Sequence, residues 1–117
     1  MFHFEQLEVY KRTIVFIDVI YKITRNFPKS ELYGLSSQLQ RAATSIALNI
    51  AEGQGRHHSK DFQRFLRMAI GSMHETIVCL DLARQQGYIK EEIYQKLYRE
   101  AEQITKMLHG LRKSIQS

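Results

Sequence analysis

The chain has 117 residues, of which 44% are hydrophobic and 25% are charged, and its formal net charge at pH 7 is +5. This composition is typical of a globular domain, and a chain of this length forms one core without metal or disulfide support. The single cysteine, Cys79, excludes an intramolecular disulfide and any metal site built from several cysteines.

Residues 5–26 are predicted to form a long helix with more apolar surface than a single core requires. Its apolar side chains form two stripes at helical spacing: Leu7, Tyr10, Ile14, Ile17 and Tyr21, and Val9, Phe16, Ile20 and Ile23. Asp18 and Lys22 interrupt the uncharged run, which is therefore too short to cross a bilayer. Because the N-terminus also lacks the pattern of a signal peptide, we expect a cytoplasmic protein.

Pro28 ends this helix, and a second helix is predicted over residues 35–52. A continuous apolar face runs along it: Leu35, Leu39, Ala42, Ala43, Ile46 and Ile50. Gly53 and Gly55 are expected to stop it, since glycine commonly follows a helix end.

A third helix is predicted over residues 59–86, with Ser59 as its N-cap and Gly87 as its stop, and a fourth over residues 90–115. Their apolar stripes are Phe62, Leu66, Ala69, Met73, Ile77 and Leu80, and Ile93, Leu97, Ala101, Ile104, Leu108 and Leu111. No segment alternates apolar and polar residues as a strand would. Four helices with short connections predict an all-α, antiparallel up-down-up-down four-helix bundle, with residues 1–117 as a single domain.

A polar stripe beside the apolar face of the second helix raises three alternatives: a catalytic constellation, a nucleic-acid surface, or a seam between helices. At 100° per residue, the stripe falls within a sector of roughly 80°. We interpret it, with two residues of the third helix, as a structural polar seam: Gln38, Arg41, Ser45, Asn49, Glu52, Ser72 and Glu75. Arg41 is expected to pair with Glu75, so that their alanine variants destabilise the fold non-additively.

Catalysis is the weaker reading of these polar residues. Glu52 and Glu75 are possible paired carboxylates, and His57, His58 and His74 are possible bases or ligands. A metal site in a bundle requires Glu-x-x-His motifs or several inward carboxylates, and no such motif occurs. The glycines of "EGQGR" lack the lysine and serine or threonine of a phosphate loop. We therefore predict no catalytic residues, no metal site and no cofactor.

Four basic residues recur about one turn apart at the start of the third helix and in the linker before it: Arg56, Lys60, Arg64 and Arg67. They form either a solvated face or a contact for the phosphate backbone of a nucleic acid. We do not expect this segment to read single strands by base stacking. Arg99, Lys106 and Lys113 on the fourth helix alternate with Glu102 and indicate solvent exposure instead.

The stretches "FPKSELYGLSSQLQRAATSIALNIAEGQGR" and "FLRMAIGSMHET" closely resemble the four-helix-bundle family encoded by intervening sequences of bacterial 23S ribosomal RNA genes. The broad family includes the accessory variability determinant of diversity-generating retroelements. The residues that carry the resemblance are Phe27, Pro28, Glu31, Tyr33, Gly34, Leu35, Gln38, Arg41, Ala42, Ala43, Ser45, Ile46, Asn49, Ile50, Ala51, Glu52, Gly53, Ala69, Gly71, Ser72 and Glu75.

The resemblance implies an antiparallel bundle that assembles as a homopentamer. For the retroelement branch it implies association with reverse transcriptase and with nucleic acid. Nothing in the sequence separates that branch from the ribosomal-gene branch.

Two functional hypotheses follow. The first is a non-enzymatic oligomer that binds RNA or DNA through Arg56, Lys60, Arg64 and Arg67. The alternative is a protein-interaction scaffold, for example for a reverse transcriptase, that does not bind nucleic acid directly.

Overall fold

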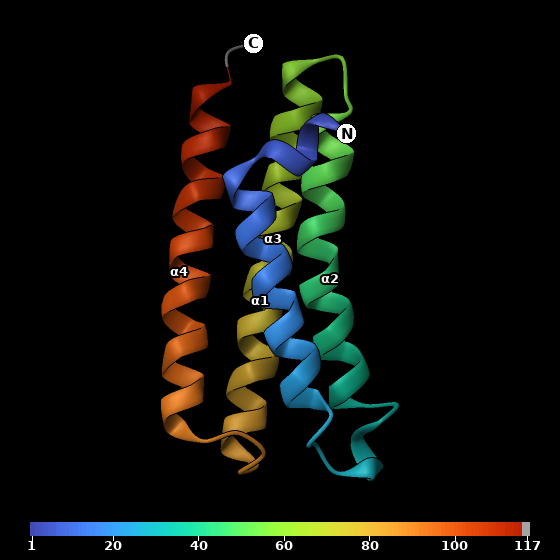
Figure 1. Ribbon diagram of the computed structural model, residues 1–117, viewed down its shortest axis with the longest axis vertical. Coiled ribbons are helices and arrows are strands. Elements are labelled where there is room, and N and C mark those ends of the chain that lie inside the picture. Colours follow the sequence, from blue (N-terminus) through green and yellow to red (C-terminus); the bar gives the residue numbers. More distant parts are fainter. Residues whose placement is uncertain (116–117) are drawn as a thin grey trace.

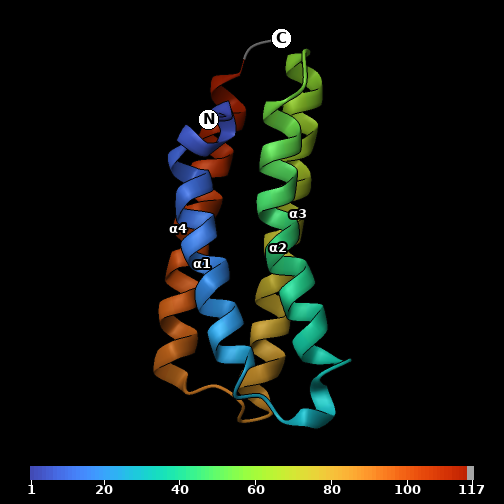
Figure 2. The same cartoon turned by 45° about the vertical axis from the view of Figure 1, so that its right-hand side comes forward.

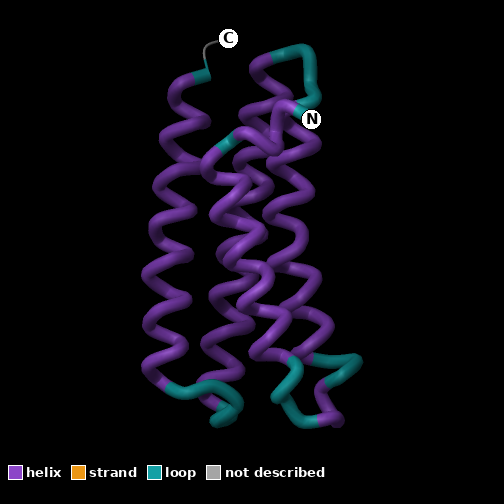
Figure 3. Tube along the Cα trace, in the orientation of Figure 1, coloured by secondary structure: helices purple, strands orange, loops and turns teal. Residues whose placement is uncertain are grey.

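The computed structural model describes residues 1–115 and shows four long helices in an antiparallel up-down-up-down bundle (Figures 1 and 3). The elements in chain order are the 3-10 turn η1 (His3–Gln6), α1 (Glu8–Thr24), the 3-10 turn η2 (Lys29–Glu31), α2 (Leu35–Gln54), α3 (Ser59–Gln85) and α4 (Glu91–Ser114). The bundle measures 45 × 24 × 23 Å. The predicted fold class is confirmed, and the described residues contain no strand.

The four helices form a ring in which consecutive helices pack against each other and α4 packs against α1. In Figure 2, α1 and α4 lie on one side and α2 and α3 on the other. The N-terminus, the α2–α3 connection and the end of α4 share one end of the bundle (Figure 1). The start of α3 and the end of α4 are therefore neighbours, although they are far apart in the sequence.

The core consists of most of the apolar stripes that the sequence predicts, but Ile14, Tyr21 and Ile93 of those stripes are exposed. Its largest fully buried apolar side chains are Phe16, Ile20, Leu39, Ile46, Ile50, Leu66, Met73, Leu80, Ile104 and Leu108. Two threonines are also fully buried, and each donates its hydroxyl to a carbonyl one turn earlier: Thr13 to Val9 at 2.7 Å and Thr76 to Ser72 at 2.8 Å. Their polar atoms therefore remain hydrogen-bonded inside an apolar core. Within residues 1–115, no helix has the length and apolar character needed to cross a membrane.

Gly53 does not stop α2, contrary to the prediction, because the helix continues through it to Gln54. A Cβ atom at this position would lie 2.8 Å from Cβ of Phe65 and 2.9 Å from Cδ1 of Phe62. Gly53 therefore allows α2 and α3 to approach closely at this end of the bundle. The expected N-cap of α3 is also one residue off: His58 has the extended backbone of a cap, and Ser59 is the first helical residue.

The predicted stop at Gly87 is confirmed by the backbone geometry. Gly87 has φ +79°, in the left-handed region that favours glycine. The amide of Gly87 donates to the Arg84 carbonyl at 3.0 Å, and the amide of Tyr88 donates to the Ala83 carbonyl at 2.9 Å. This pair of bonds is the Schellman motif, which satisfies the last carbonyls of α3.

Candidate nucleic-acid interface

A short polar contact joins α2 to α3 where the sequence predicts a seam. The hydroxyl oxygens of Ser45 and Ser72 are 2.8 Å apart, and one hydroxyl donates to the other. Asn49 donates its amide to the Ser45 carbonyl at 2.9 Å and lies 3.1 Å from the Ser45 hydroxyl. All three side chains are partly buried, and these hydrogen bonds satisfy their polar groups at the contact between α2 and α3.

The outer part of the predicted seam is different. Arg41 and Glu75 are exposed and line one hollow of about 390 Å³ with Gln38, but no ion pair joins them in the described part of the chain. Glu52 is also exposed, and it pairs with Arg56 at 3.0 Å. The expectation of an Arg41–Glu75 pair was wrong: both residues face solvent, where an ion pair gains little free energy.

The polar residues considered for catalysis do not come together. His74 lines a pocket between α3 and α4, whereas Glu75 lines the hollow between α2 and α3. His57 and His58 are exposed in the α2–α3 connection. Within residues 1–115, no three His, Cys, Asp or Glu side chains form a group that could hold a metal ion.

The four predicted basic residues, here called the basic face (Arg56, Lys60, Arg64 and Arg67), are all exposed at the end of the bundle where α3 begins. The guanidinium carbons of Arg56 and Arg64 each lie 4.7 Å from the centroid of the Phe65 ring. Arg56 also pairs with Glu52 at 3.0 Å, and Arg64 pairs with Asp61 at 3.6 Å. These contacts hold the two arginines in place but neutralise part of their charge.

Lys60 and Arg67 are different, because neither has an acidic partner within residues 1–115. Three cations of α1 are each paired: Lys11 with Glu8, Arg12 with Glu100 and Lys22 with Asp18. An exposed cation without an acidic partner adds its full charge to the local potential. The positive potential of the basic face therefore comes mainly from Lys60 and Arg67.

The end of α4 packs against the first turns of α3, a contact that the sequence pattern does not indicate. Gln63 donates its amide to the Ile115 carbonyl at 2.6 Å and lies 3.5 Å from the Arg112 carbonyl. This contact brings Arg112 alongside the first turns of α3, whereas Lys106 lies farther along α3, beside Met73 and His74. Gln63 and Arg112 are 49 positions apart in the chain, so only the antiparallel pairing of α3 with α4 could have indicated this contact.

These features define the class of protein: it is an antiparallel four-helix bundle with a polar contact between α2 and α3 and a cluster of cations at one end. A protein-family model described as 23S rRNA-intervening sequence protein matches residues 5–110. The chain belongs to this family, and the predicted resemblance is confirmed.

Among solved structures, the chain is similar to a protein of unknown function from the S23 ribosomal protein family of Bacteroides thetaiotaomicron. The TM-score is 0.83 at 26% identity, and the match covers 90% of this chain and 95% of that one. No curated protein matches the chain significantly.

Proposed function

We propose that the protein is a non-enzymatic, oligomeric helical bundle that binds nucleic acid through the basic face. The observation that carries the proposal is the exposure of Lys60 and Arg67, which have no acidic partner among residues 1–115, on the turns of α3 that the end of α4 contacts through Gln63. Cations that contact phosphates displace condensed counterions, and this term dominates sequence-independent binding. The start of α3 also presents backbone N–H groups and the positive end of the helix dipole at the same place.

Exposed apolar side chains support the oligomeric part of the proposal. Val15 is 65% exposed, Leu48 is 64% exposed and Val78 is 58% exposed, on three different helices. A strongly apolar groove also runs between α1 and α4, and Val15 and Ile93 are among the residues that line it. Exposed apolar surfaces of this kind mark sites of contact between proteins. A homopentamer would present five basic faces, and a nucleic acid that contacts several of them at once would be bound more tightly than by one.

Filter binding of structured ribosomal RNA across a salt series tests the proposal. We expect the affinity to fall steeply with salt, and we expect reversal of all four charges of the basic face to abolish binding. Affinity that is independent of salt, or that survives the reversal, would rule the proposal out. Mass measurement in solution tests the subunit number separately.

The exposed apolar surfaces also favour a second candidate, a scaffold that binds another polypeptide such as a reverse transcriptase. The experiment that separates the two is a pull-down with purified reverse transcriptase after nuclease treatment and at high salt. Retention under both conditions supports the scaffold, since a contact mediated by nucleic acid would be lost.

A further inference from the structure

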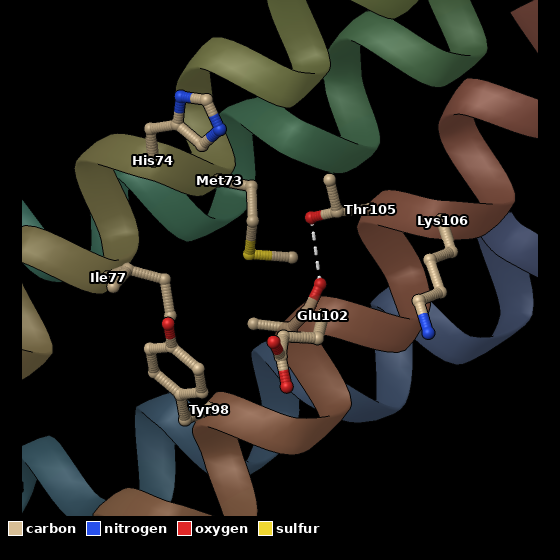
Figure 4. A pocket seen from close by; sticks show the side chains of 8 residues that line it. Met73, His74, Ile77, Tyr98, Glu102, Thr105 and Lys106 are labelled. Carbon is tan, nitrogen blue, oxygen red and sulfur yellow. Dashed lines mark hydrogen bonds between the residues drawn. The ribbon is translucent and has the colours of Figure 1, made fainter.

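A pocket of about 400 Å³ opens between α3 and α4, about midway along α3 (Figure 4). This volume falls in the range of roughly 300–1,000 Å³ that small-ligand sites occupy. The lining residues are Met73, His74 and Ile77 of α3, and Tyr98, Ala101, Glu102, Thr105 and Lys106 of α4.

The deepest part of the pocket is apolar. Met73 is only 1% exposed and Ala101 only 2% exposed. Tyr98 is 38% exposed and extends from α4 toward Ile77 on the opposite wall (Figure 4). Because Tyr98 and Met73 both line the pocket, an aromatic ring and apolar side chains offer a surface on which a planar heterocycle can pack.

The polar groups of the pocket lie at its rim. His74, Glu102 and Lys106 are exposed and present a ring nitrogen, a carboxylate and an ammonium group. The Thr105 hydroxyl donates to the Ala101 carbonyl at 2.8 Å and is already satisfied (Figure 4). A ligand with a flat apolar face and a polar edge therefore matches both parts of the pocket.

The charge along the α3–α4 seam is uneven. Arg67 precedes His74 by two turns on the same side of α3, about 10 Å along the helix axis, so the basic face leads toward the pocket. At the other end of the seam, Arg84 pairs with Asp81 at 2.6 Å and with Glu91 at 3.4 Å. A polyanion that binds the basic face can therefore follow the seam as far as the pocket, where Lys106 stands without an acidic partner among the described residues.

We infer that this pocket receives an unpaired base of a single-stranded nucleic acid whose backbone phosphates contact Arg67 and Lys106. The inference rests on the proposed function and narrows its substrate class to single strands with accessible bases. A duplex keeps its bases stacked inside, so it can contact the basic face but cannot enter the pocket.

The test compares fluorescein-labelled oligouridylate with an RNA duplex of equal length, using fluorescence anisotropy. We expect Tyr98→Ala to weaken oligouridylate binding about tenfold and to leave duplex binding unchanged, because base stacking on an aromatic side chain is lost. Tyr98→Phe keeps the ring and should retain the wild-type affinity. Tyr33→Ala is the matched control, since Tyr33 is 94% exposed and lies outside the pocket.

Crosslinking provides a second readout. Oligouridylate that carries thiouridine should crosslink under ultraviolet light to the peptide that contains Tyr98. Equal oligouridylate affinity of wild type and Tyr98→Ala would overturn the pocket assignment while leaving the proposed function intact. A wild-type protein that binds neither RNA would overturn both. A Tyr98→Ala variant with a smaller assembly mass would show that a second copy of the chain covers the pocket, which also overturns the assignment.

Discussion

The hydroxyl groups of Ser45 on α2 and Ser72 on α3 share one hydrogen bond of 2.8 Å between two partly buried side chains. Asn49 extends the contact by bonding to both the hydroxyl and the carbonyl of Ser45. The polar strip of α2 thus has a structural use at its inner edge, where it faces α3.

Removing one of the two serine hydroxyls should cost more than the bond itself, because its partner loses a hydrogen bond in a partly dry site. We expect Ser45→Ala and Ser72→Ala each to lower the free energy of unfolding by about 1 kcal/mol. The double variant should lose less than the sum of the two, as a double-mutant cycle from urea unfolding can measure. Strictly additive losses would show that the two hydroxyls do not interact in solution.

Arg41→Ala and Glu75→Ala provide the contrasting pair. Because both side chains are exposed and no ion pair joins them, their effects on the free energy of unfolding should add within about 0.5 kcal/mol. The same urea titrations measure this cycle. A coupling free energy above about 1 kcal/mol between Arg41 and Glu75 would instead show that the predicted ion pair forms in solution.

The fold could be predicted from the sequence because apolar stripes at helical spacing determine which residues are buried. The seam was predictable only in part. Helical periodicity places Ser45 and Arg41 on the same side of α2, but it does not distinguish an edge that faces α3 from one that faces water. That distinction depends on how the two helices are rotated against each other, which is a tertiary property.

The candidate interface shows the same limit at longer range. The basic face could be read from the sequence because its four cations are local. The sequence could not place Tyr98 and Lys106 near α3, because only the packing of α4 against α3 brings them close to Met73 and His74. The ion pairs of Arg56 and Arg64 reduce the effective charge, and they join residues four and three positions apart, so helical spacing alone indicates them.

Gly53 should be intolerant of substitution although it lies inside a helix. Gly53→Ala places a methyl group against Phe62 and Phe65, and we expect the free energy of unfolding to fall by roughly 1–3 kcal/mol. Gly71→Ala is the control, because a Cβ there meets nothing within 4 Å and should stabilise α3 by roughly 0.5–1 kcal/mol. Thermal unfolding of both variants measures the difference, and stabilisation by Gly53→Ala would contradict the close approach of α2 and α3.

Cys79 should be unreactive in the native protein. It is 2% exposed, and burial, with a smaller contribution from the nearby Glu75 carboxylate, raises the pKa of its thiol. The pKa of the Cys79 thiol is therefore higher in the folded protein than in the unfolded chain. The contribution of this thiol to the free energy of unfolding is fully present below the pKa of the unfolded chain, and it is lost as the pH rises through the pKa of the folded protein. Iodoacetamide at mildly alkaline pH should modify the denatured chain rapidly and the native chain only as fast as it opens. Equal rates in the two states would place Cys79 at the surface.

The salt dependence of RNA binding most directly tests whether Lys60 and Arg67 contact phosphates. In the logarithmic plot of affinity against salt, the double variant Lys60→Gln/Arg67→Gln should have a slope that is shallower by about 1.4 for a single strand, or about 0.7 per lost contact. Lys11→Gln/Lys22→Gln removes the same charge from α1, where both lysines are ion-paired, and should leave the wild-type slope. Equal slopes for the two double variants would contradict binding through the basic face and attribute any affinity to net charge alone.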